Sequence, residues 1–311
     1  MTKYPLAISL FSILSFSCDQ GEAPSRQLAE KPESSEDEFA NPGSATRPIS
    51  PTPVPSATPI PNKVVSQGID LFVLAGQSNA RGHQGDAAGF KAEPIDEKIL
   101  FRGNFAPISG GAANSAWVKL QPQVGTFAKG HFGPEVALAR KLADAGLNPA
   151  VYKYTASSTS IYEDWRLPGG TGLYSSMVRD LLAAKVLLEK SSGKTVAFRG
   201  FIWIQGESDA QTAATAKLYH DSLLKIVNDF RTNVAKTPDM PILLGVDEQH
   251  PWVVANPAVV DAQKKLAVDL KNVVATSMIG LAKADTTHLT PVGLLAHGQR
   301  LFEALLPLLQ E

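Results

Sequence analysis

The feature that most constrains the fold is the alternation of strand-like and helix-like patterns between residues 68 and 311. Five runs there have the length and β-branched composition of buried strands, and helical patterns lie between most of them. The five runs are residues 69–75, 149–156, 195–205, 240–248 and 272–278. Alternating strands and helices predict an α/β domain with a parallel sheet covered on both faces. In such folds, functional side chains gather at the carboxyl ends of the strands.

The N-terminal part of the chain is predicted to lie outside this domain. Residues 1–17 hold a short apolar run after Lys3, which predicts a signal peptide that is too short to span a bilayer. Cys18, the only cysteine, follows in "LSFSC", which resembles a bacterial lipoprotein cleavage site although Ser15 stands where leucine is usual. We expect an exported protein with a lipid anchor on Cys18, at the periplasmic or cell-surface face. Ordinary secretion, with Cys18 incidental, is the alternative.

Residues 18–67 differ in composition from both their neighbours. They contain nine of the 22 prolines and few apolar residues, which predicts a disordered, proline-rich tether. Residues 68–311 then form a single domain. The net charge of -1 gives the chain no general attraction to nucleic acid or to an anionic membrane surface. We expect a monomer without a cofactor, whose membrane contact is limited to the lipid anchor.

Polar groups follow four of the five predicted strands, at the edge where an α/β site would form. Ser78 follows the first run within "GQSN", and Asp285 and His288 follow the fifth within "DTTH". A serine hydroxyl needs a base to act as a nucleophile, and histidine is the usual base. Asp285, three residues before His288, can orient the imidazole ring. Together these residues predict nucleophilic catalysis by serine, although each stretch alone is compatible with a polar turn or a helix cap.

A serine nucleophile also requires hydrogen-bond donors for the oxyanion of its tetrahedral intermediate. Backbone N–H groups of Ser78 and of "SSTS" (157–160), which follows the second run, are candidates. The side-chain amide of Gln205, in "QGESD" after the third run, is another. A solvated loop, and a polar turn with Asp209 as a helix cap, are the alternatives for these two stretches. The six histidines form no ligand pair at short spacing, so we predict no metal site.

Five motifs, in this order, make the chain similar to a known family. They are "GQSN", "FGPE" (132–135), "KYTASSTSIYEDW" (153–165), "WIQGESD" (203–209) and "DTTHLTPVG" (285–293). The combination resembles SGNH-type hydrolases, in particular the sialate O-acetylesterase-like and plant-type acetylxylan esterases of carbohydrate esterase family six. It covers nearly all of residues 68–311. The resemblance implies a three-layer α/β/α sandwich, here with about five parallel strands, and hydrolysis of acetyl esters on sugars of the acetylated xylan or sialic acid type.

The resemblance also implies a role for individual residues. Ser78 corresponds to the nucleophile, His288 to the base and Asp285 to the acid that orients the base. Glu207 is a second candidate for that acid, because some members of this branch are thought to use the glutamate of "QGE". Gln205 stands where other SGNH enzymes hold an asparagine, and therefore corresponds to an oxyanion donor.

The chain departs from the family at one motif. The family usually has "GGTS" after the second strand, where this chain has Ser157 and Ser158. The backbone N–H of Ser158 survives the replacement, but the residue is strained if the turn requires a positive φ. "FGPE" is predicted to be mainly structural, with a supporting contact by Glu135.

The sequence therefore predicts a serine esterase that deacetylates carbohydrate through an acyl-enzyme. Two other functions stay open. A lipid or thioester hydrolase of the same fold would need a long apolar acyl pocket. A non-catalytic, carbohydrate-binding surface lipoprotein is supported only by the replacement at Ser157 and Ser158.

Overall fold

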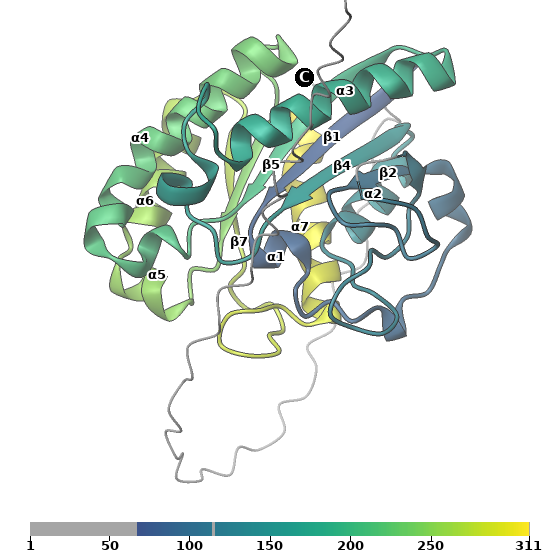
Figure 1. Cartoon of the computed structure of the whole chain (residues 1–311). Helices are drawn as coiled ribbons and strands as arrows, with labels where there is room; N and C mark the ends of the chain where they lie inside the picture. The colour runs from purple at the N-terminus through teal and green to yellow at the C-terminus, as the bar shows by residue number, and fades with distance from the viewer. Residues whose placement is uncertain (1–66, 114–115, 311) are drawn as a thin grey trace, which may run out of the picture. The chain divides into compact units, whose positions relative to one another are not determined.

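The structure of the protein is a computed structural model that describes residues 67–113 and 116–310 (Figure 1). The predicted signal peptide, Cys18 and the predicted tether up to residue 66 lie outside these residues. The described residues belong to one of the two units into which the chain divides, and this unit spans residues 58–311. None of the helices among them is long and apolar enough to cross a membrane.

A seven-stranded sheet in the order β3-β2-β4-β1-β5-β6-β7 forms the middle of this domain. The strands are β1 (Ile69–Gly76), β2 (Leu100–Gly103), β3 (Val118–Lys119), β4 (Pro149–Thr155), β5 (Val196–Ile204), β6 (Ile242–Val246) and β7 (Val273–Ser277). The five predicted strands are all present, as β1, β4, β5, β6 and β7, and neighbours among them pair in parallel. The expected α/β fold is therefore confirmed, with two more strands than the sequence predicts.

The two additional strands, β2 and β3, lie at one edge of the sheet. β2 pairs in parallel with β4, whereas β3 pairs antiparallel with β2, so the sheet is mixed at this edge. β2 reads only "LFRG" and β3 only "VK", which is too short to stand out as an apolar run. Arg102 of β2 is buried in an ion pair with Asp180, 3.1 Å away. Short strands of this kind form because of their neighbours and not because of their own pattern.

Helices cover both faces of the sheet and complete the three layers (Figure 1). The α-helices are α1 (Ser78–Arg81), α2 (Glu135–Asp144), α3 (Leu173–Ser192), α4 (Ala213–Asp229), α5 (Pro251–Ala255), α6 (Ala258–Asp269) and α7 (Pro291–Leu309). The short 3₁₀ or π segments are η1 (Ala87–Gly89), η2 (Pro94–Lys98), η3 (Ile161–Trp165), η4 (Asp209–Gln211) and η5 (Phe230–Ala235). Side chains alternate across β1. Leu71 and Val73 pack with residues of α3, α4 and α6, while Phe72 and Leu74 pack with residues of α2 and α7.

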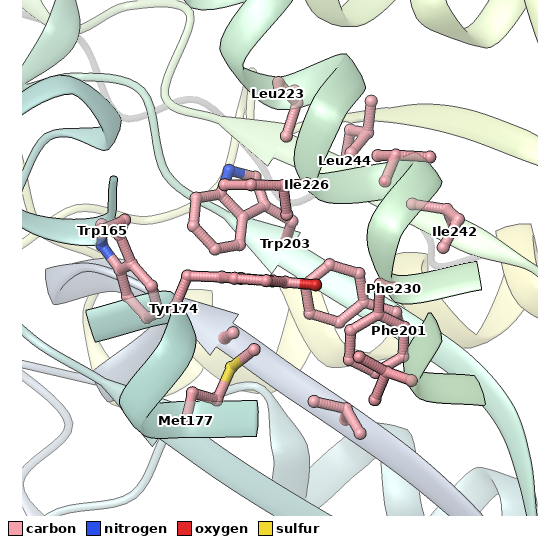
Figure 2. Close-up of a cluster of buried hydrophobic side chains, with 14 of the residues drawn as sticks. Trp165, Tyr174, Met177, Phe201, Trp203, Leu223, Ile226, Phe230, Ile242 and Leu244 are labelled. Carbon is pink, nitrogen blue, oxygen red and sulfur yellow. The ribbon is translucent and has the colours of Figure 1, made fainter. Parts of the chain in front are cut away.

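The first of these two clusters is rich in aromatic side chains (Figure 2). Phe201 of β5 stacks on Phe230, with 4.2 Å between the ring centroids and 5° between the planes. Trp203 of β5 meets Trp165 of η3 edge to face at 4.8 Å. The indole N–H of Trp165 donates to the hydroxyl of Thr159, 2.9 Å away. The core therefore anchors the segment that follows β4.

The order of the strands places three loops side by side. β4 and β5 flank β1 on opposite sides, so the chain changes direction across the sheet at β1. In open α/β sheets, the carboxyl ends of the strands at such a point form the crevice where ligands bind. The segments that follow β1, β4 and β5 carry Ser78, the "SSTS" turn (157–160) and "QGESD" (205–209). The topology thus brings the predicted polar groups to one edge.

Candidate active site

Ser78 lies at the point where β1 turns into α1, and the turn depends on Gly76. Gly76 has a φ of +143°, and a Cβ added there would collide with the carbonyl oxygen of Ile204. The close approach lets the N–H of Gln77 donate to that same carbonyl at 2.9 Å. Ser78 is then the first residue of α1 and is 3% exposed. Only glycine fits this sharp turn, because any side chain at this position would meet the backbone of β5.

Asp285 and His288 form a close pair in the loop between β7 and α7 (residues 278–290, the β7–α7 loop). Oδ2 of Asp285 lies 2.9 Å from Nδ1 of His288. Oδ1 of Asp285 accepts the backbone N–H groups of Thr287 at 2.7 Å and of His288 at 2.6 Å. Burial opposes the charged carboxylate, but the hydrogen bonds from His288 and Thr287 outweigh it and hold the pKa of Asp285 below its usual value. Asp285 is therefore ionised at neutral pH and directed at the imidazole.

Asn79 and His83 bring this pair to the nucleophile. Asn79, next to Ser78, donates its amide to the carbonyl of Thr287 at 3.0 Å and accepts the N–H of Leu289 at 3.1 Å. These two bonds lie on either side of His288 in the chain. The His83 ring lies 4.5 Å from the His288 ring, and the His83 N–H donates to the carbonyl of Ser78 at 3.0 Å. Residues more than 200 positions apart thus meet at one place.

The "SSTS" turn lies against the start of α1. The N–H of Ala156 donates to the carbonyl of Gly76 at 3.0 Å, and the Thr159 hydroxyl closes the turn on the carbonyl of Ala156 at 2.7 Å. Ser158 has a φ of +54°, in the left-handed region that favours glycine. The strain expected at this replacement is therefore present. Among the described residues, no backbone carbonyl of a turn, loop or cap accepts the N–H of Ser78 or the N–H of Ser158.

Gln205 does not serve as the free amide donor that the sequence predicts. It is fully buried, and its Nε2 donates to the carbonyl of Thr159 at 2.9 Å and to Oδ2 of Asp209 at 2.5 Å. Both partners are acceptors only, so the amide nitrogen must face them and both of its hydrogens are engaged. The prediction of a third oxyanion donor is wrong for this conformation. Gln205 instead joins the "SSTS" turn to the segment after β5.

Asp209 caps a helix, but not the one that follows it in the chain. Its carboxylate accepts the N–H of Ile161 at 3.0 Å and the N–H of Tyr162 at 3.4 Å, at the start of η3. Burial raises its pKa to about 6, against the hydrogen bonds from Gln205 and from the backbone of η3. The carboxylate therefore fixes the segment after β4 from the neighbouring strand.

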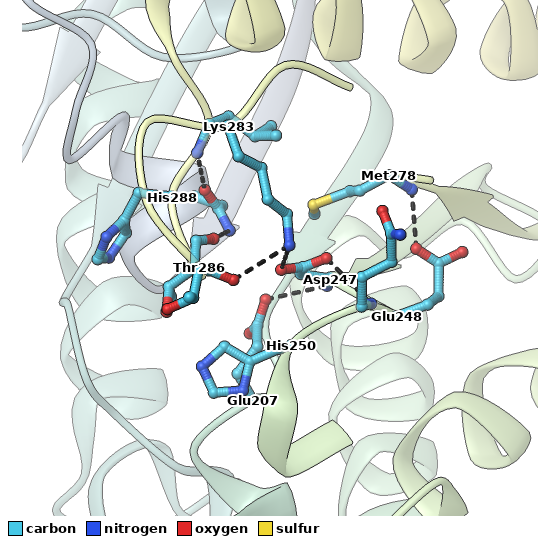
Figure 3. Close-up of polar contacts among 12 residues, drawn as sticks. Glu207, Asp247, Glu248, His250, Met278, Lys283, Thr286 and His288 are labelled. Carbon is cyan, nitrogen blue, oxygen red and sulfur yellow. Dashed lines mark hydrogen bonds and ion pairs between the residues drawn. The ribbon is translucent and has the colours of Figure 1, made fainter. Parts of the chain in front are cut away.

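Glu207 contacts Asp247 and not His288 (Figure 3), and its carboxyl group is also hydrogen-bonded to the Asn79 side chain. Its Oε1 accepts the N–H of Asp247 at 3.0 Å, and no hydrogen bond joins it to His288 among the described residues. Burial raises the pKa of Glu207 to about 7. The alternative in which Glu207 orients the base is therefore not supported by the geometry, since Asp285 already contacts Nδ1.

Lys283 connects Asp247 to the β7–α7 loop and was missed by sequence reasoning. Its Nζ forms an ion pair with the fully buried Asp247 at the end of β6 and donates to the carbonyl of Thr286 at 3.2 Å. The loop that carries Asp285 and His288 is thus attached to the sheet edge by one long side chain (Figure 3). The only sequence signal is a lysine two residues before Asp285.

A second lysine, also missed, lies beneath α1. Lys153 of β4 is fully buried, and its Nζ lies 2.8 Å from Oε1 of Glu135 and 2.8 Å from the carbonyl of Arg81. Glu135 also accepts the N–H of Gly133 at 2.9 Å. Burial lowers the pKa of Lys153, against the charge of Glu135. The supporting contact predicted for Glu135 is present. Glu135 holds Lys153, and Lys153 in turn donates to the carbonyl of Arg81, the last residue of α1.

The described residues contain no group of three or more His, Cys, Asp or Glu side chains that could hold a metal ion. The polar groups that the structure brings together here are the hydroxyl of Ser78, the imidazole of His288 with Asp285, and the nearby backbone N–H groups. This set can carry out acyl transfer.

Comparisons with known proteins identify the family of the chain and agree with its fold. The model of the family described as "Carbohydrate esterase, sialic acid-specific acetylesterase" matches residues 68–307. A solved structure of a protein from Arabidopsis thaliana superposes with a TM-score of 0.60 at 23% identity, over 77% of this chain and 98% of that one. A carbohydrate acetylesterase from Xanthomonas citri superposes with a TM-score of 0.51 at 18% identity, over 76% of this chain and 55% of that one. No curated protein matches. At these identities the two structures show a shared fold alone.

Proposed function

Because the chain belongs to the carbohydrate esterase family of sialic acid-specific acetylesterases, we propose that it is a serine esterase that removes O-acetyl groups from carbohydrate through an acyl-enzyme. The observation that carries the proposal is the Asp285–His288 pair, which Asn79 holds beside Ser78 through two hydrogen bonds. A nucleophile, a base and an acid that orients the base are the parts that acyl transfer from an ester requires.

The mechanism uses each of these groups once in each half of the reaction. The Ser78 hydroxyl attacks the acetyl carbonyl while His288 takes its proton, and Asp285 stabilises the imidazolium. The backbone N–H groups of Ser78 and Ser158 donate to the oxyanion. His288 then gives the proton to the departing sugar oxygen, which leaves acetyl-Ser78. Water, deprotonated by His288, then attacks the acetyl-enzyme, and His288 returns that proton to the Ser78 oxygen as acetate leaves.

The first experiment separates a serine esterase from a binding protein. We expect Ser78→Ala to remove nearly all hydrolysis of p-nitrophenyl acetate and all labelling by a fluorophosphonate probe, with an unchanged circular dichroism spectrum. A folded wild-type protein that takes up no probe would instead favour the non-catalytic, carbohydrate-binding alternative.

The second experiment identifies the substrate class. Acetate release is measured on acetylated xylan, on O-acetylated sialic acid and on p-nitrophenyl esters of increasing chain length. We expect release from at least one acetylated carbohydrate and a decline in rate beyond the acetyl ester. A rate that rises with chain length would favour the lipid or thioester hydrolase.

The export route of the protein is a separate proposal, supported by the apolar run and by Cys18 in the sequence. We expect the full-length chain to incorporate an alkyne-tagged palmitate in a bacterial host and to fractionate with membranes. Cys18→Ala should abolish both, whereas secretion of the unlabelled wild-type chain would favour an ordinary signal peptide. Light scattering of the purified protein tests the expectation of a monomer.

A further inference from the structure

His250, in the turn between β6 and α5, presents a hydrogen-bond donor that the proposed mechanism does not use. Its side chain is buried at 6% exposure. Its Nδ1 accepts the N–H of Trp252 at 3.2 Å. An imidazole nitrogen that accepts carries no proton, so the neutral ring holds its proton on Nε2. No hydrogen bond occupies Nε2 within the part of the chain that the structure describes. His250 is thus a fixed donor without an acceptor.

This donor lies beside the candidate active site. The N–H of His250 bonds to the carbonyl of Asp247, the residue whose carboxylate pairs with Lys283 of the β7–α7 loop. Figure 3 draws the His250 and His288 rings at the edge of the network that contains Glu207, Asp247 and Lys283. Burial lowers the pKa of His250, and the charges of Asp247, Lys283, His288 and Asp285 also act on it.

Trp252 places an aromatic face next to the same donor. The residue is 41% exposed, and the centroid of its ring lies 5.0 Å from that of the His250 ring, at 59° between the planes. The neighbouring residue Val253 is 1% exposed and holds α5 against the domain. The amide of Asn256, just after α5, donates to the carbonyl of Ala210 at 2.8 Å. The indole is therefore solvent-accessible while its backbone is attached at both ends.

We propose that His250 and Trp252 form a subsite for the pyranose ring that carries the ester. One face of a pyranose ring consists of C–H groups, which pack on an aromatic ring, while its hydroxyls require polar partners. Trp252 supplies the aromatic face, and Nε2–H of His250 donates to a hydroxyl or to the ring oxygen. The inference rests on the proposed function, because it concerns the sugar part of the same substrate.

The test compares a sugar ester with an ester that has no sugar. The substrates are acetylated xylobiose and p-nitrophenyl acetate, and the variants are Trp252→Ala, Trp252→Phe and His250→Asn. Asparagine is a favoured N-cap residue and can still accept the N–H of Trp252, but it is too short to donate from the position of Nε2. Val254→Ala, a truncation of another exposed side chain on the same helix, is the matched control.

We expect Trp252→Ala to raise KM for acetylated xylobiose about ten-fold and His250→Asn to raise it about five-fold, the size of one aromatic or hydrogen-bonding contact. Trp252→Phe should retain most of the affinity, and Val254→Ala all of it. For p-nitrophenyl acetate, kcat/KM should stay within about two-fold of wild type in every variant. An equal loss on both substrates, or no loss on the sugar ester, would overturn the subsite.

A binding measurement tests the subsite independently of turnover. The Ser78→Ala variant is titrated with acetylated xylobiose while tryptophan fluorescence is followed. A change that disappears in Ser78→Ala/Trp252→Phe supports the subsite, and the absence of any change in Ser78→Ala contradicts it. If the wild type hydrolyses the aryl ester but no acetylated sugar while the fluorescence still responds, the proposed substrate is wrong and the subsite stands.

Discussion

The two halves of the candidate site are held in different ways. Ser78 is buried at 3% exposure and follows directly from the central strand β1, whereas the side chains of Asp285 and His288 are 40% and 21% exposed on a loop. The serine is positioned by sheet hydrogen bonds and by the buried Lys153–Glu135 pair beneath α1. The loop is positioned by single side chains, mainly Asn79 and Lys283.

This difference indicates where mutation costs stability and where it costs activity. Changes beneath α1 disturb the core and should act on the free energy of unfolding. Changes in the contacts of the β7–α7 loop should act on the alignment of His288 with Ser78, and so on kcat. Each half contains one lysine paired with a buried carboxylate, so the two can be compared by the same substitution.

The largest expected effect is that of Lys153→Met. Methionine leaves the Glu135 carboxylate buried without its partner, and breaking a buried ion pair in this way costs about 3–5 kcal/mol. Urea unfolding monitored by circular dichroism measures the loss. Lys185→Met, which removes a surface pair within α3, is the control and should cost less than about 0.5 kcal/mol. Equal free energies of unfolding for the two variants would contradict the larger contribution assigned to the buried Lys153–Glu135 pair.

The second effect concerns pH and the carboxyl of Glu207. Burial raises its pKa from 4.5 to about 7, so between these values the folded state binds a proton that the unfolded state has released. Stability from this group is therefore present below about pH 4.5 and is lost as the pH rises to about 7.

The size of the Glu207 effect is on the order of 3 kcal/mol, from about 1.4 kcal/mol for each pKa unit. The free energy of unfolding is measured by chemical denaturation at several pH values for wild type and for Glu207→Gln. The difference between the two proteins at each pH gives the contribution of Glu207. We expect the wild type to lose stability relative to the variant as the pH rises. Parallel curves would show that Glu207 is not protonated more readily in the folded state.

The third effect is that of Lys283→Met on catalysis. The substitution frees the β7–α7 loop from Asp247, and a displacement of His288 by about 1 Å can lower kcat by up to about 100-fold. The rate of fluorophosphonate labelling of Ser78 reports this without a sugar substrate.

A double variant separates positioning from stability at this lysine. In Lys283→Met/Asp247→Asn no buried charge is left unpaired, so the free energy of unfolding should recover while labelling stays slow. If the free energy of unfolding and the rate of labelling both recover, Lys283 acts on stability alone. Lys271→Met removes an exposed pair with Asp239 just before β7 and should change neither quantity.

The smallest expected effect is that of Ser158→Gly in the "SSTS" turn. Glycine relieves the positive φ of +54°, at the cost of a more flexible unfolded chain, so the net gain in stability is roughly 0.5 kcal/mol. Activity should be kept, because the backbone N–H is unchanged. Ser157→Gly, at a residue without a positive φ, should bring no gain in thermal unfolding. A destabilised Ser158→Gly variant would argue against strain at this residue.

The parts of the structure that the sequence predicted are those encoded by a local pattern. The five long strands were recognisable because their apolar runs fill a core on both faces of the sheet. The start of α7 also depends on a local pattern, because Thr290 caps it, accepting the N–H of Gly293 at 3.1 Å, and Pro291 follows. Asp285 and His288 lie three residues apart, so their contact is local as well.

Other features could not be read from any pattern. The short strand β2 pairs with β4 and β3 pairs with β2, so both are defined by their neighbours in the sheet. The sequence predicts Gln205 as an oxyanion donor, but Thr159 and Asp209, from two different loops, accept the hydrogen bonds of its amide. Lys153 and Lys283 are ordinary lysines in the sequence, and only the folded chain gives them buried carboxylate partners.

The sequence by itself determined the α/β architecture and the chemical groups Ser78, Asp285 and His288 that are the candidates for catalysis. These depend on hydrophobic periodicity and on the chemistry of short motifs. The tertiary structure decided which carboxylate meets His288, what Gln205 contacts and how the β7–α7 loop is attached. Those outcomes depend on distances between segments far apart in the chain, and a hydrogen bond forms only where folding brings donor and acceptor within about 3 Å.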